Sequence, residues 1–90
     1  MVDKQKIEEL ICNQQYENAI KALSDNVAAE PDNADWLIQR GQLQWRLGQR
    51  GRAMSDMEAA AALDPGSAAP GYLDHYRSIM DFFSTDMFNP

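Results

Sequence analysis

Hydrophobic residues recur along much of the chain at three- and four-residue steps, the spacing that places them on one face of an α-helix. Near the start, Ile7, Leu10 and Ile11 follow this spacing. A little further on, Ala19 and Leu23 lie one helical turn apart. The alternating pattern of a half-buried β-strand is absent. The pattern therefore predicts an all-α fold.

Short breaks divide this pattern into five helices. The polar residues 13–15 interrupt the first apolar stretch, and Pro31 ends the second because the residue before a proline avoids helical geometry. Gly48 is expected just past the end of the third helix. Pro65 and Gly66 close the fourth. Asp3 and Ser67 are candidate caps for the first and last helices. The predicted helices span residues 3–12, 16–29, 34–47, 50–62 and 68–84, and residues 85–90 are predicted to be an irregular tail.

The two proline breaks share a motif. Glu30-Pro31 in the first becomes Asp64-Pro65 in the second. Shifting the sequence so that Pro31 falls on Pro65 also places helices on helices and breaks on breaks. A period of about 34 residues with two helices in each unit is the signature of a tetratricopeptide repeat. We therefore expect one domain with a first repeat at 1–33, a second at 34–67 and a half-repeat at 68–84.

The stretch "DWLIQRGQLQWRLGQRGRAMSDMEAAAALDP" resembles a tetratricopeptide repeat over its whole length. Gly41 and Ala53 match the small residues at the crossing of the two helices, and Gly48 matches the glycine of the turn. Arg40 departs from the pattern, because leucine is usual at its position. The first repeat is more degenerate, with Gln14 at the place of the turn glycine. The ending "MDFFSTDMFNP" is similar to the closing segment of small bacterial tetratricopeptide proteins.

The resemblance implies an α-α superhelix of about two and a half repeats, in which residues 68–84 form a capping helix. It also implies a protein-interaction module that binds a protein or peptide segment in a concave groove lined by the first helix of each repeat. Trp45 and the tyrosines have two open interpretations, because aromatic residues at helical spacing also build cores. The candidate groove residues are Ile11, Ile38, Gln42, Trp45, Arg46, Tyr72 and Tyr76.

Charge narrows the range of partners. The chain carries a formal net charge of −6, which argues against nucleic-acid binding because that function needs a basic face. The positive charge gathers between residues 36 and 54, where four arginines are the only charged residues. Arg46, Arg50 and Arg52 either offer a site for an acidic partner segment or neutralise nearby carboxylates on a solvated surface.

Catalytic and cofactor signatures are absent from the sequence. Cys12 and His75 are the only cysteine and the only histidine. They fall on the first and last predicted helices, too far apart for a nucleophile pair. No glycine-rich nucleotide motif and no metal-ligand spacing occurs. We expect no enzyme activity, no cofactor and no metal.

The chain also lacks a signal-peptide pattern and an apolar run of membrane-spanning length, so we expect a cytoplasmic protein that binds no membrane. The alternative to partner recruitment is an architectural role. Because stacked repeats usually need about three units for stability, this chain could gain buried surface by forming homodimers or larger assemblies.

Overall fold

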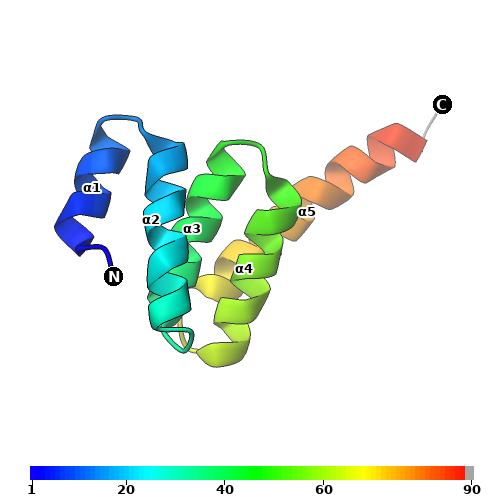
Figure 1. The fold of residues 1–90 in the computed structure, drawn as a ribbon. Helices are drawn as coiled ribbons and strands as arrows, with labels where there is room; N and C mark the ends of the chain where they lie inside the picture. Colours follow the sequence, from blue (N-terminus) through cyan, green and yellow to red (C-terminus); the bar gives the residue numbers. More distant parts are fainter. Residues whose placement is uncertain (89–90) are drawn as a thin grey trace.

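The computed structural model describes residues 1–88, with side chains described through Phe82, and all of its regular structure is helical (Figure 1). This confirms the predicted all-α fold of five helices. Within residues 1–88 the structure contains no β-strand. The helices are α1 (Lys4–Cys12), α2 (Tyr16–Ala29), α3 (Ala34–Arg46), α4 (Arg50–Leu63) and α5 (Ala69–Phe88).

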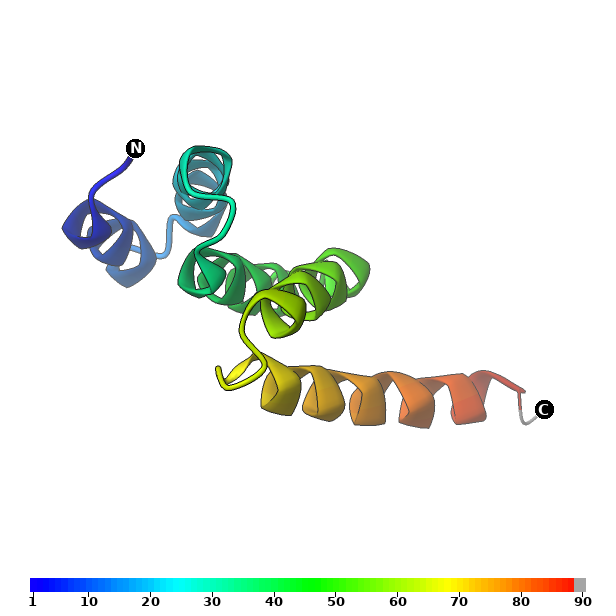
Figure 2. The same ribbon diagram turned by 90° about the horizontal axis from the view of Figure 1, so that it is seen from below.

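Each helix packs against the next one along the chain, and the first four run alternately up and down (Figure 1). The contact between α3 and α4 is the most extensive. The start of α5 lies against α4, whereas its C-terminal half extends beyond the other four helices (Figures 1 and 2). The molecule is therefore elongated, with principal extents of 48 × 29 × 17 Å.

The turn of the first helix pair recurs in the second. In the α1–α2 turn, the Gln14 N–H donates to the Ile11 carbonyl at 3.0 Å. In the α3–α4 turn, the Gly48 N–H donates to the Trp45 carbonyl at the same distance. The next amide in each turn reaches back to a carbonyl in the last turn of the preceding helix, at 2.8 Å in both. Gln14 and Gly48 also share a left-handed backbone, with φ of 61° and 80°. The two helix pairs thus use one turn geometry.

Two apolar clusters hold the helices together. Ile7 and Leu23 are fully buried in the cluster between α1, α2 and α3. Met57 is fully buried in the cluster between α3, α4 and α5. Trp36, on α3, belongs to the first cluster, and Val27, on α2, packs against both. The core is therefore continuous along the array, because α2 and α3 contribute to each of its halves.

Helix ends differ from the sequence expectation at two places. Asp3 occupies the cap position of α1, but its side chain makes no capping hydrogen bond. The prediction of an irregular tail after residue 84 was wrong, because α5 continues to Phe88. No glycine or proline lies between Gly71 and Pro90, so the sequence contains no residue that would stop the helix earlier. Residues 89 and 90 lie outside the described residues.

Candidate functional site

The contact between α3 and α5 is made by aromatic and amide side chains. Trp45 stacks on Tyr76 with a centroid separation of 3.9 Å and an interplanar angle of 4°. The Gln42 side-chain amide donates to the Tyr72 hydroxyl at 2.7 Å. Stacking and a short hydrogen bond each restrict side-chain rotation. These four residues therefore form a fixed platform, called the aromatic platform below.

The members of the aromatic platform are exposed to different degrees. Tyr76 is only 4 % exposed and belongs to the core cluster of α3, α4 and α5. Trp45, Gln42 and Tyr72 are half-buried, so each keeps part of its surface toward solvent. Tyr76 therefore forms the buried side of the platform, while the other three residues form its partly exposed side.

The remaining candidate groove residues flank the platform or lie at a distance from it. Ile38 is half-buried on α3, one helical turn before Gln42, and packs against the same core cluster. Arg46 is exposed at the end of α3. Ile11 is half-buried at the end of α1 and packs against the other core cluster. The structure therefore joins Gln42, Trp45, Tyr72 and Tyr76 into one site. It leaves Ile11 at the other core cluster and places Arg46 over Tyr16 of α2.

Burial changes the acidity of the supporting tyrosine. Desolvation raises the pKa of the Tyr76 hydroxyl above its ordinary value, and the neighbouring Tyr72 raises it further. Loss of solvent disfavours the charged phenolate form. The Tyr76 hydroxyl therefore keeps its proton at physiological pH.

The four central arginines have different surroundings. Arg40 donates two hydrogen bonds to the Asp56 carboxylate, at 2.7 and 2.8 Å, and a third to the Ser24 hydroxyl at 3.2 Å. The Asp56 hydrogen bond raises the pKa of Arg40, against the opposing effect of burial. Gln44 completes the group when its amide nitrogen faces Asp56, at 2.8 Å from Oδ2. Arg40 is therefore a structural residue that joins α3 to α4.

The sequence analysis did not predict the Arg40–Asp56 pair. The two residues lie on different helices, so only the fold brings them together. The available signal was the charged residue at a position where the resemblance implies leucine. A buried arginine must find a partner.

Two of the other arginines lie over aromatic rings. The Arg46 guanidinium carbon is 4.9 Å from the Tyr16 ring centroid, and that of Arg50 is 5.3 Å from the Trp45 centroid. Both distances suit a cation–π interaction. Among the side chains described through Phe82, Arg46 and Arg52 make no ion pair within 4.0 Å. Their charges are thus available to an acidic ligand.

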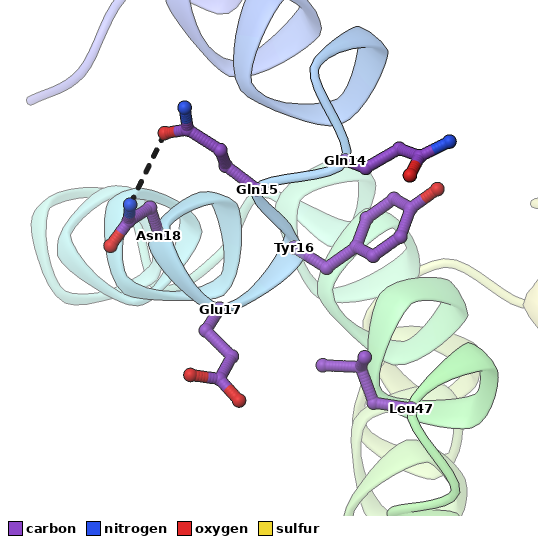
Figure 3. A pocket seen from close by; sticks show the side chains of 6 residues that line it. All are labelled: Gln14, Gln15, Tyr16, Glu17, Asn18 and Leu47. Carbon is purple, nitrogen blue, oxygen red and sulfur yellow. Dashed lines mark hydrogen bonds between the residues drawn. The ribbon is translucent and has the colours of Figure 1, made fainter.

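A polar cleft opens where the α1–α2 turn meets the end of α3 (Figure 3). Arg46 does not line the cleft, but its guanidinium lies over Tyr16, which does. Its volume is about 290 Å³. The side chains of Tyr16 and Leu47 face each other across it, and Gln14 extends along one edge (Figure 3). We call it the turn cleft; its lining residues are Gln14, Gln15, Tyr16, Glu17, Asn18 and Leu47.

Candidate metal ligands do not converge in the described part of the chain. Cys12 is exposed on α1 and His75 is exposed on α5. Within the described residues, no three His, Cys, Asp or Glu side chains are placed to share a metal ion. Of the helices described, none is both long and apolar enough to cross a membrane.

Comparison with known proteins adds no family assignment. No protein-family profile matches the chain, and no curated protein matches it.

Proposed function

We propose that the chain is a non-enzymatic protein-binding module of the tetratricopeptide type, which binds a protein or peptide segment on the surface formed by α3 and α5. The observation that carries the proposal is the aromatic platform, with the exposed Arg46 next to Trp45 in the sequence of α3. Aromatic residues and arginine are the side chains that most often anchor protein interfaces.

Rigidity of the platform favours binding. The stacked Trp45–Tyr76 pair and the Gln42–Tyr72 hydrogen bond hold their side chains in place before a partner arrives. A partner therefore loses less free energy to side-chain ordering than it would on a mobile surface. Half-buried Trp45 and Tyr72 offer apolar contact, while the amide of Gln42 supplies polar recognition.

The charge of Arg46 favours one class of partner segment. Arg46 is exposed and makes no ion pair among the side chains described, so a carboxylate of the partner can form a charge-assisted hydrogen bond with it. The four side chains of the platform are themselves neutral, and the Arg50 guanidinium lies over the Trp45 ring. We therefore expect a segment with apolar or aromatic side chains over the platform and an acidic residue near Arg46.

Selection of short random peptides displayed on phage tests the proposal. The wild-type chain should enrich peptides that combine aromatic and acidic residues, and Arg46→Glu should abolish their enrichment. Lys21→Glu is the matched control, because Lys21 is an exposed residue of α2 and its charge changes by the same amount. Equal enrichment by all three proteins, or none by any, would overturn the proposal.

Trp45 provides a second test on the selected peptides. Removing a central anchor typically costs about 2 kcal/mol or more of binding free energy, so Trp45→Ala should weaken peptide binding strongly. Trp45→Phe keeps a stacking ring and should retain much of the affinity. Circular dichroism must show that both variants keep the parent's helical content. Unchanged affinity in a folded Trp45→Ala variant would place the binding surface elsewhere.

A further inference from the structure

A second cleft is lined by side chains of α2, α3 and α4, and it shares no residue with the aromatic platform. Its volume is about 570 Å³, which is within the range of small-molecule sites. Its lining differs from that of the turn cleft, whose charged residue is the acid Glu17. Here Arg40 of α3 and Arg52 of α4 line the walls, so we call it the arginine cleft.

The arginine cleft carries a positive charge, although the chain as a whole is acidic. Arg40 and Asp56 neutralise each other through two hydrogen bonds of 2.7 and 2.8 Å. The Gln44 amide nitrogen, when it faces Asp56, also lies 2.8 Å from this carboxylate. The Arg52 guanidinium is exposed and makes no ion pair among the side chains described. Because Asp56 is the only acid in the lining, the charge of Arg52 is left without a counter-charge there.

Hydrogen-bond donors in the arginine cleft exceed what the Asp56 carboxylate can accept. A guanidinium has five N–H groups, and those of Arg52 have no acceptor among the described side chains. The Ser24 hydroxyl accepts a hydrogen bond from Arg40 at 3.2 Å, so its own hydrogen is left to donate. Ser55 lies one helical turn after Arg52, is exposed, and makes no hydrogen bond among the described residues. The cleft therefore suits a ligand that brings several acceptor oxygens.

From this surplus of donors and the uncompensated Arg52, we propose that the arginine cleft binds a phosphoryl group, as inorganic phosphate or on a phosphorylated small molecule. The guanidinium of arginine matches two phosphate oxygens at once. Ser24 on α2 and Ser55 on α4 can donate to further oxygens.

A phosphoryl group suits this arrangement better than a carboxylate does. The donors come from three helices, α2, α3 and α4. A carboxylate holds its two oxygens in one plane, whereas a phosphoryl group directs three acceptor oxygens to different sides. The inference is independent of the proposed function, because the two sites have no residue in common.

Titration of the ¹⁵N-labelled full chain with inorganic phosphate tests the proposal, with amide chemical shifts as the measurement. Sodium chloride keeps the ionic strength constant. The shifts should saturate and should be largest around Ser24 and in residues 51–56. Arg52→Gln should weaken binding at least about tenfold, and Ser55→Ala about threefold. Both positions are exposed, so the variants should keep the fold.

Arg77→Gln is the matched control for Arg52→Gln. Arg77 is an exposed arginine of α5 that does not line the arginine cleft, and its replacement changes the net charge by the same amount. This variant should bind phosphate as the wild type does. Equal weakening by both variants would show a response to net charge and would overturn the proposal.

Two further probes identify the ligand. Phenyl phosphate adds an apolar ring that can contact Ile20 in the lining. Tighter binding of phenyl phosphate than of phosphate therefore indicates a phosphorylated organic ligand, and equal or weaker binding indicates inorganic phosphate. Acetate should bind at least about tenfold more weakly than phosphate. The proposal is overturned by shifts that do not saturate, by phosphate binding that Arg52→Gln leaves unchanged, or by acetate binding as tight as that of phosphate.

Discussion

The two helix pairs, α1–α2 and α3–α4, share one turn geometry but differ in their interiors. Their turns make the same hydrogen bonds at equivalent positions, although one uses Gln14 and the other Gly48. A non-glycine residue with positive φ is uncommon. The packing of each helix pair therefore imposes the turn conformation. The residue type at the turn position changes only how stable that conformation is.

The two pairs also differ in the size of the residues at equivalent interior positions, most of all at Ile7 and Gly41. Ile7 and Leu23 fill the first interior, whereas Gly41 and Met57 occupy the same places in the second. A Cβ atom on Gly41 would lie 3.0 Å from Met57 Cε and 3.3 Å from the Ala53 carbonyl oxygen. The second pair thus crosses more closely, and Met57 supplies the volume that Gly41 lacks.

The third difference is polarity. Arg40 and Asp56 form an ion pair in the second helix pair, with side-chain exposures of 21 % and 9 %. The equivalent positions of the first pair hold Lys6, which is exposed, and Ala22, which is buried. The contact between these two positions, called the seam below, is therefore a largely buried ion pair in the second helix pair but not in the first. The charged seam lies where α2 also approaches, through the Ser24 hydroxyl.

The largest expected effect is the loss of one partner from the charged seam. Asp56→Ala leaves the Arg40 guanidinium, which is mostly buried, with the Ser24 hydroxyl as its remaining partner. Breaking a buried pair costs about 3–5 kcal/mol, and the residual exposure of Arg40 favours the lower end. Urea unfolding followed by circular dichroism measures this loss.

A double variant sharpens the same test. Arg40→Leu with Asp56→Ala makes the seam apolar and gives position 56 the alanine that its counterpart Ala22 has. Replacing a whole buried pair by apolar residues is often neutral or stabilising. The double variant should therefore recover most of the stability that Asp56→Ala loses. If the double variant is less stable than Asp56→Ala, apolar residues cannot replace the Arg40–Asp56 ion pair at this contact.

The next effect comes from the close crossing of α3 and α4. Ala53 is fully buried opposite Gly41, so Ala53→Leu should lower the free energy of unfolding by about 1–3 kcal/mol through overpacking. Ala59→Leu is the matched control, because Ala59 is exposed on the same helix. Thermal denaturation compares the two, and equal melting temperatures would contradict the close crossing.

Exchanging the residue types of the two turns should change the free energy of unfolding by a smaller amount. The change should have opposite signs in the two helix pairs. Gly48→Gln places a side chain on a residue with φ of 80° and should cost about 1 kcal/mol. Gln14→Gly relieves the same strain at φ of 61°. Its gain should be smaller, because glycine loses more backbone entropy on folding. Chemical denaturation of both variants checks the sign, and a stabilised Gly48→Gln would refute the comparison.

The smallest effect concerns pH. The pKa of Tyr76 is raised in the folded state, so the folded protein holds this proton at a pH where the unfolded chain has released it. Stability from this group is complete below the unfolded pKa, about 10, and is lost as pH rises through the folded value. The pH dependence of unfolding around and above that value should therefore be steeper in wild type than in Tyr76→Phe. Parallel curves would show that Tyr76 is solvated.

The sequence alone determined the positions of the helices and the period of the array. Helical spacing of apolar residues, with breaks at 13–15, Pro31, Gly48 and Pro65, was enough to define the five helices, because these signals are local. The end of α5 was predicted too early, although no glycine or proline lies between Gly71 and Pro90.

Only the tertiary structure decided which side chains meet. The stacking of Trp45 on Tyr76 joins α3 to α5, and the Arg40–Asp56 pair joins α3 to α4. Sequence spacing gives the face of a helix on which a residue lies, but the crossing of two helices decides its neighbour and its burial. For this reason Trp45 and Tyr76, which the sequence left open between groove and core, became the presented and the supporting parts of one platform.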